Sequence, residues 1–549
     1  MKNRPLFPRK LLKGAYKKYL RSSLEAINGF TTSGPYKTIL TYLDTDSKEK
    51  KHYEADIALS NQDTKRGIDF KISIEEQLRN GGVKFLNSYG LQDAFQIYND
   101  SFKLVADAGA VQNFECNFPA LPRLLTGYLD SLRTQRKSYD NSYFRMCIPV
   151  GDTDIIYPVA IVDSNLHLVF DVSQWDMQPS LIGIRFPSIK GMCVALEIRQ
   201  KRFHFYAVED IKCVFIDSLE KGLLDEFQSL AADIRLAFGF LTARYYSGDV
   251  FVLTSKDKHF KKINDVVYHL ERDPINGKQQ LINPTQLFQF YQHFGSEQFK
   301  KKFHDFHDRF SASVFSSFCS SLANPELRRA TEILVNACSI NEPLQQGILA
   351  SVALETITEL VAEENEQTIK PIPDKPLAKA LIKRLKQVVR DEFDGVPTEG
   401  LPVIDSKLSD LNKPTNKGKL LFPFKHYGIT LTQSEENILD HRNDFLHGRT
   451  PHGTESDWEL EQIALKLHYL AGIVILKYIG YTGHVMNLPF WNLFNHQERM
   501  VSIFPIANDR LKEIADKVTK GKEISDEDME TLEQAGNLSL FIENIIQLI

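Results

Sequence analysis

The spacing of apolar residues changes once along the chain, near residue 217, and this change constrains the fold more than any other feature of the sequence. From about residue 30 to 216, short β-branched and aromatic runs are bounded by turn residues, which is typical of strands. After residue 217, apolar residues recur at helical spacing, as in Leu223, Phe227, Leu230 and Ile234. The sequence therefore predicts an α+β fold, with a β-rich domain followed by helices.

The length of the chain indicates several domains. A chain of 549 residues exceeds the size at which a single hydrophobic core stops growing. We expect a basic N-terminal arm over 1–29, a β-rich domain over 30–216, a helical connecting region over 217–323, an all-α bundle over 324–482 and a C-terminal extension over 483–549.

Helix boundaries in the C-terminal half are marked by capping residues. Asn324 before Pro325 predicts a helix that runs to about residue 339, and Pro343 predicts another that runs to about residue 364. A proline-containing loop over 365–376 precedes a helix with a basic face, which we expect over 377–393. Two Ser/Thr-x-x-Glu capping boxes, at 432–435 and 456–459, predict helices that begin at 433 and 457.

Composition excludes some classes of protein. The net charge is −5, so any contact with nucleic acid has to be local. The six cysteines lie far apart with no CxxC, which argues against a zinc ribbon and a disulfide framework and favours a reducing, cytoplasmic compartment. The longest strongly apolar run, Leu470–Leu476, is shorter than the roughly 18 residues that a bilayer requires, so no membrane segment is expected.

The N-terminus is the one strongly basic stretch. Its interrupted apolar residues do not match a signal peptide. We consider two interpretations: a basic helix packed on an acidic surface, or an arm that binds a polyanion. The basic residues are Lys2, Arg4, Arg9, Lys10, Lys13, Lys17, Lys18 and Arg21.

The segment His441–Arg449, HRNDFLHGR, places a cation where packing alone would favour leucine. At about 100° per residue from Ile438, the apolar stripe of this helix is centred near ~40°, and Arg442 also falls at ~40°. An unpaired guanidinium in a buried stripe costs several kcal/mol. Arg442 must therefore find an anion, reach solvent or face a cavity. The apolar positions are Ile438, Leu439, Phe445 and Leu446.

Three polar side chains can meet at the end of this helix. Asn443 and His447 are four residues apart, hence on one face, and that face adjoins Arg442. Gly448 offers the left-handed residue that ends helices. An arginine that binds phosphate and a histidine that moves protons near neutral pH suit phosphodiester chemistry without a metal, because RNA supplies its own nucleophile.

This stretch resembles a known family. Arg442–His447, RNDFLH, is similar to the R-x4-H signature of HEPN-domain ribonucleases, including the polar residue after the arginine. In that family the motif ends a helix of a four- or five-helix bundle, and two protomers pair so that both motifs line one cleft. The helices expected over 325–482 have the matching number and order. A β-rich region ahead of such a bundle resembles the architecture of ApeA-like anti-phage proteins.

The resemblance implies a function and its residues. It implies a metal-independent endoribonuclease without cofactors, active as a homodimer through the bundle, in prokaryotic anti-phage defence (abortive infection) or a toxin-like setting. Arg442 and His447 map onto the family's essential pair, and Asn443 onto its polar position. The substrate would be RNA, with transfer RNA among the candidates. The β-rich domain would recognise a phage-derived trigger or restrain the nuclease, because an unregulated ribonuclease poisons its own cell.

Three further residues are weaker candidates. Arg449 and His452, just past the motif, could bind RNA phosphates, or they could belong to a solvated loop. Glu355, in an apolar helix, could pair with Arg442, or it could be an ordinary exposed acid.

Competing interpretations remain open for the motif. The chain contains a second R-x4-H, Arg199–His204, on strand-like sequence with no helix to end. His441–Arg449 could also be a polar helix C-terminus with cations at its negative end. A HEPN-like module could bind nucleotide or protein without catalysis. The basic N-terminus and helix 377–393 could instead bind DNA.

Overall fold

The fold is given by a computed structural model, in which two compact units can be described. Unit 1 comprises residues 1–239, 244–276 and 309–320, and unit 2 comprises residues 240–243, 277–308 and 321–549. The structure describes residues 20–32, 36–43, 50–60, 67–74, 95–99, 103–117, 123–136, 138–151, 155–163, 193–208, 211–282, 310–394, 399–451, 456–489, single residues between 513 and 528, and 546–548.

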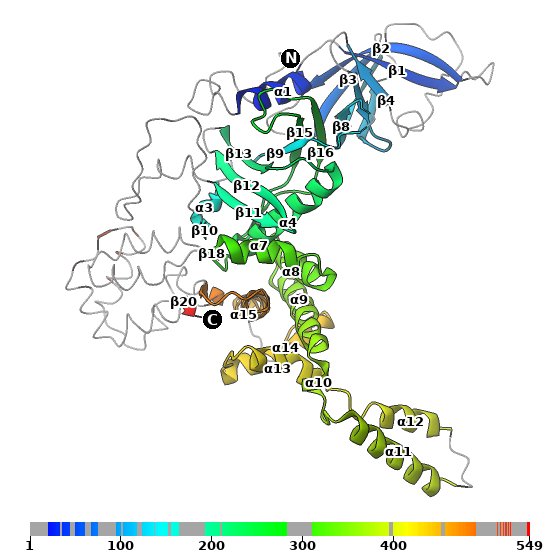
Figure 1. The fold of residues 1–549 in the computed structure, drawn as a ribbon, viewed down its shortest axis with the longest axis vertical. Coiled ribbons are helices and arrows are strands. Elements are labelled where there is room, and N and C mark those ends of the chain that lie inside the picture. Colours follow the sequence, from blue (N-terminus) through cyan, green and yellow to red (C-terminus); the bar gives the residue numbers. More distant parts are fainter. Residues whose placement is uncertain are drawn as a thin grey trace. The chain divides into compact units, whose positions relative to one another are not determined.

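Unit 1 is built on a 14-stranded sheet whose pairings are all antiparallel (Figure 1). The strands, in their order across the sheet, are β11 (Val194–Ile198), β12 (Lys201–Val208), β13 (Cys213–Ser218), β9 (Tyr143–Pro149), β15 (Asp249–Ser255), β16 (Asp265–Leu270), β8 (Ser131–Thr134), β5 (Lys103–Ala106), β4 (Phe95–Tyr98), β1 (Tyr36–Leu43), β2 (Lys50–Ser60), β3 (Ile68–Ile74), β7 (Arg123–Leu129) and β6 (Val111–Asn117).

Helices pack on this sheet through their apolar residues. Helix α1 (Arg21–Thr32) buries Leu24 and Ile27, and helix α4 (Leu224–Thr242) sets Phe238 edge-on against Phe205 of β12, with ring centroids 5.2 Å apart. The smaller elements are α3 (Pro158–Ile161), α7 (Ala312–Ser321), the parallel pair β10 (Val162–Asp163) and β18 (Phe310–Ser311), and the antiparallel pair β14 (Arg244–Tyr245) and β17 (Ile275–Asn276).

Two parts of unit 1 differ from the sequence expectation. The region 217–323 was expected to be helical, and it does hold α4 and α7, but β15 and β16 lie inside the large sheet. Their β-branched and aromatic runs, such as DVFVLTS in β15, are strand-forming, and sheet neighbours cover them. The sequence 155–162 is strand-like, yet Pro158 begins the short helix α3. The basic stretch 1–19 lies outside the described residues.

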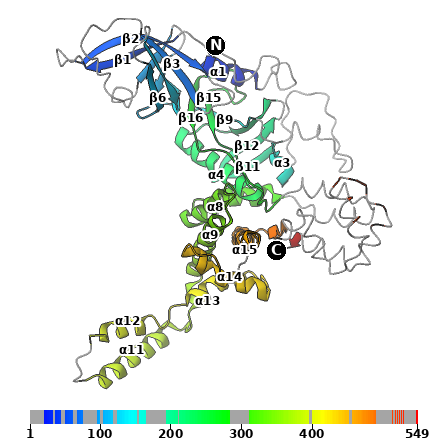
Figure 2. The same ribbon diagram turned by 180° about the vertical axis from the view of Figure 1, so that it is seen from behind.

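Unit 2 is helical, and α9 is its central element. Helix α9 (Pro343–Glu364) contacts α8 (Pro325–Ala337), α13 (Asn416–His426), α14 (Gln433–Leu446) and α15 (Asp457–Tyr478). The other helices are α10 (Glu366–Ile369), α11 (Lys375–Glu392) and α12 (Leu401–Ser409). Figure 2 shows the same elements from behind. The strand-rich N-terminal half and helical C-terminal half confirm the expected α+β class.

Local capping chemistry fixes the starts of these helices. Asn324 accepts hydrogen bonds from the backbone N–H groups of Glu326 and Leu327, and both expected capping boxes are formed, at Thr432 and at Ser456. Helices α8, α9, α14 and α15 therefore begin at the expected residues.

The start of the C-terminal extension is tied to unit 2. Strand β19 (His484–Met486) pairs with β20 (Ile546–Leu548), and the Met486 N–H donates to the Leu281 carbonyl at 2.9 Å. No helix among the described residues is long and apolar enough to cross a bilayer.

Candidate active site at the end of helix α14

Helix α14 is anchored at its first turn. The Glu435 carboxylate accepts from the Thr432 N–H at 2.9 Å and from Lys466 of α15 at 3.0 Å. Burial raises the pKa of Glu435, but the Thr432 N–H and the Lys466 ammonium outweigh burial and hold that pKa below its ordinary value. A buried, ionised Glu435 therefore ties the start of α14 to α15.

The last turns of α14 are fixed against α9. Phe445 is fully buried and lies against Gly347, where a side chain would collide with its ring. Leu439 is also buried. The stripe of α14 that faces the core thus contains Glu435, Leu439, Arg442 and Phe445.

Arg442 lies within this buried stripe, as its helical position predicts. It is 8% exposed. Its Nη2 donates to Oδ1 of Asn443 at 3.1 Å, and its Nε is buried with no partner among the described residues. No carboxylate in the described part of the chain forms an ion pair with it. The guanidinium is therefore held by packing, and its charge is not neutralised there.

Comparison with the other buried arginines shows how unusual this is. The described residues include three buried arginines. Arg145 binds Asp217 through two hydrogen bonds of 2.7 Å, and Arg235 binds Glu271 through two of 2.5 and 2.8 Å. Only Arg442 has no carboxylate among the described residues. Because the buried guanidinium of Arg442 has no carboxylate partner among the described residues, it can bind an anionic group of a ligand.

Helix α14 ends as the sequence predicts, with a left-handed glycine. His447 is the C-cap, and Gly448 follows with φ of +65°. The Gly448 N–H donates to the Phe445 carbonyl and the Arg449 N–H to the Asp444 carbonyl, each at 2.8 Å. This capping leaves the backbone groups of the last turn satisfied.

The His447 and Asn443 side chains are exposed at this helix end. Among the described residues, no hydrogen bond reaches the His447 imidazole. Positions 442 and 447 are five residues apart, which an ideal helix separates by about 140°. The structure joins Arg442 to Asn443 by a hydrogen bond but shows none between Arg442 and His447 of the same chain.

The weaker candidates are placed as follows. Arg449 is exposed, and His452 lies outside the described residues. Glu355 is exposed on α9, and no ion pair between it and Arg442 occurs in the described part of the chain. The ordinary-acid interpretation of Glu355 fits this geometry better. Near the motif, His441 Nδ1 lies 3.6 Å from an Asp444 carboxylate oxygen.

The second R-x4-H has a structural role. Arg199 and Gln200 form the two-residue turn between β11 and β12, and both have positive φ. Arg199 pairs with the fully buried Asp233 at 2.9 Å. The cation is thus already bound to a carboxylate, and the strand context expected from the sequence separates this instance from the motif of α14.

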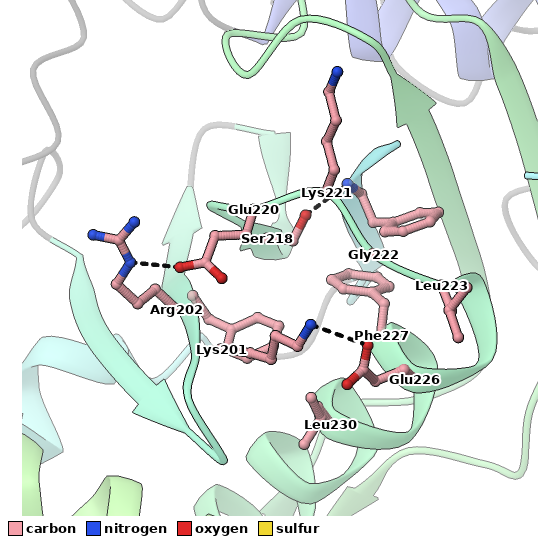
Figure 3. A pocket seen from close by; sticks show the side chains of 12 residues that line it. Lys201, Arg202, Ser218, Glu220, Lys221, Gly222, Leu223, Glu226, Phe227 and Leu230 are labelled. Carbon is pink, nitrogen blue, oxygen red and sulfur yellow. Dashed lines mark hydrogen bonds and ion pairs between the residues drawn. The ribbon is translucent and has the colours of Figure 1, made fainter. Parts of the chain in front are cut away.

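Sequence reasoning did not find the pocket at the start of α4 (Figure 3). It is a small, open surface hollow with the stacked rings of Phe144 and Phe227 in its wall. Two cations on it are paired with carboxylates, as the ion pairs Lys201–Glu226 at 3.4 Å and Arg202–Glu220 at 2.7 Å show. The pocket contains none of the candidate site residues.

Comparisons with known proteins do not identify the chain. Searches against protein-family models, curated proteins and solved structures give no match. Within the described residues, no group of three or more His, Cys, Asp or Glu side chains is arranged to hold a metal ion.

Proposed function

We propose that the chain is a metal-independent endoribonuclease of the HEPN type, with Arg442, Asn443 and His447 as its catalytic residues. One observation carries the proposal. Arg442 is the buried arginine without a carboxylate in the described part of the chain, and it lies four residues before Leu446, the last residue of α14, next to the exposed Asn443. A phosphodiester would supply the missing anion.

The proposed chemistry uses only groups of the protein and the RNA. His447 removes the proton of a ribose 2′-hydroxyl, and the 2′-oxygen attacks the adjacent phosphorus. Arg442 stabilises the charge that develops on the phosphate oxygens, and Asn443 orients the guanidinium through its 3.1 Å hydrogen bond. The bond to the 5′-oxygen breaks, and that oxygen takes a proton from a histidine. The products are a 2′,3′-cyclic phosphate and a 5′-hydroxyl.

A second copy of the chain fits this chemistry. Within one chain, positions 442 and 447 are about 140° apart around the helix, so the two side chains are not expected to reach the same phosphate. In a dimer, Arg442 of one copy and His447 of another could act on one phosphate. The resemblance to HEPN ribonucleases supports this dimer, and it supports a role in anti-phage defence with unit 1 as the sensor or restraint. Transfer RNA is one candidate substrate.

Degradation of total RNA in EDTA tests the proposal. Wild type should release fragments with cyclic phosphate ends, whereas Arg442→Ala and His447→Ala should be at least ~100-fold slower. His441→Ala is the matched control, because it removes another imidazole from the same helix. Equal degradation by all variants would remove catalysis from this motif.

One observation favours a second candidate function. The His447 imidazole has no hydrogen-bonding partner among the described residues, whereas a catalytic histidine usually has one that orients it. A module that binds nucleotide or protein without cleavage would need Arg442 but not an oriented His447. Loss of RNA binding in Arg442→Ala, without cleavage by wild type, would support that candidate.

A further inference from the structure

Helices α11 and α12 carry an unusual amount of exposed apolar surface. The two helices lie side by side in both views (Figures 1 and 2) and contact each other. Six of the eight large apolar side chains that are exposed among the described residues lie in this hairpin and its ends. They are Leu377, Leu381, Val388, Phe393, Val403 and Leu411.

Polar contacts, rather than a core, hold the hairpin together. Ile372 and Asn412 exchange hydrogen bonds of 2.8 and 3.0 Å at its base, and Arg390 pairs with Asp405 at 2.8 Å. Of all residues in α11 and α12, only Ala378 is buried. Helix α12 has nine residues, and helices shorter than about 12 residues are marginal without packing. The hairpin therefore lacks the apolar burial that normally stabilises two paired helices.

The basic face of α11 points away from the exposed apolar stripe. At about 100° per residue from Lys375, five of the six basic positions fall between ~0° and ~80°, whereas Leu377, Leu381 and Val388 fall between ~200° and ~240°. These five are Lys375, Lys379, Lys383, Lys386 and Arg390, and the sixth basic residue, Arg384, falls near ~180°. A helix that lies on an anionic membrane needs its cations beside the apolar stripe. Here five of the six cations are on the opposite side, and the acidic Asp391 lies near the sixth, which argues against an anionic lipid surface.

The charges that do border the stripe are of both signs. Arg384 and Asp391 lie near ~180° and ~160° on α11, next to the leucines. On α12, exposed Lys407 and Asp410 are close to Val403 and Leu411 in sequence. A face with apolar residues between charges of both signs can complement itself, as an interface related by two-fold symmetry requires.

We infer that this face binds the same face of a second copy of the chain. Two α11–α12 hairpins would then form a four-helix arrangement that buries the exposed leucines and valines and leaves the basic face of α11 in solvent. The inference rests on the proposed function only in that the function needs two chains. It names the surface that holds them, which is separate from the end of α14.

Sedimentation of the full-length chain tests this contact without reference to catalysis. Wild type should be a dimer, and Leu381→Glu and Val388→Glu should each raise the dimer dissociation constant at least tenfold. Both side chains are exposed, so folding should be unchanged, which circular dichroism checks. Lys379→Gln is the matched control: it changes the charge by the same amount on the opposite face and should remain dimeric.

Several results would overturn the inference. These are a monomeric wild type, dimerisation of both glutamate variants with wild-type affinity, and a wild type that stays monomeric and binds phosphatidylserine vesicles. Failure of the nuclease proposal would look different. A wild type that dimerises through α11 but cleaves no RNA would refute the proposed function alone. A monomer that cleaves RNA would refute this contact and the two-chain arrangement of the site, but not the catalytic roles of Arg442 and His447.

Discussion

The ring of Phe445 lies directly against the backbone of Gly347: a Cβ added at Gly347 would be 2.2 Å from Cε1 of Phe445. This contact sets the distance between α9 and the last turn of α14. Because Arg442 and Asn443 are within one turn of Phe445, the same contact positions the candidate site.

Gly347→Ala should therefore disturb the site through packing. The added methyl must displace Phe445, and overpacking of this kind lowers the free energy of unfolding by about 1–3 kcal/mol. RNA cleavage should fall with it. Gly29→Ala is the control, because Gly29 is also in a helix and its added Cβ has open space. That variant should be neutral or slightly stabilising. Denaturant unfolding measures the stability of both variants. A Gly347→Ala variant that is as stable and as active as wild type would contradict the packing argument.

Arg442→Met should stabilise the chain while abolishing cleavage. Methionine keeps the apolar stem and removes a buried charge that has no carboxylate among the described residues. We expect the free energy of unfolding to rise by about 1 kcal/mol, measured by urea titration. Arg145→Met removes the partner of buried Asp217 and should instead destabilise the chain. If Arg442→Met were as destabilising as Arg145→Met, Arg442 would have a structural partner.

Acid should weaken unit 2 through His468. Burial lowers the pKa of His468 to about 4, whereas an unfolded histidine titrates near ~6.5. A lowered pKa means that the neutral ring is favoured in the folded state. The neutral His468 ring therefore contributes its full stabilisation of the folded state above about pH 6.5. As the pH falls toward 4 this contribution is lost, which lowers the free energy of unfolding by about 3 kcal/mol at most. Urea unfolding between pH 7.5 and 4.5 measures this loss. His468→Phe should reduce the slope of the free energy of unfolding against pH between pH 6.5 and 5. An unchanged slope would rule out His468 as the source of the pH dependence.

The sequence predicts local structure well here and long-range structure poorly. Caps at Asn324, Thr432 and Ser456 act through neighbouring backbone groups, so helix starts follow from a few residues. The burial of Arg442 follows from helical periodicity. The run DVFVLTS of β15 is itself strand-forming, but its place inside the large sheet depends on pairing with β9, about 100 residues earlier, which no local pattern indicates. Glu435–Lys466 is likewise a contact between two helices that no local pattern indicates.

The candidate site was predictable only in part. The positions of Arg442, Asn443 and the left-handed Gly448 follow from helix geometry and capping. The expected meeting of His447 with Arg442 is not seen within one chain, because a turn of about 140° separates the two positions on an ideal helix. Glu355 was a plausible partner from composition, but its exposure on α9 depends on how the helices pack.

The most direct test of the central claim is the end chemistry of RNA incubated with purified protein in EDTA. The account predicts fragments with 2′,3′-cyclic phosphate and 5′-hydroxyl ends from wild type and from His441→Ala, and almost none from Arg442→Ala or His447→Ala. Fragments that appear only when a divalent metal is added, or that form equally with Arg442→Ala, would contradict it.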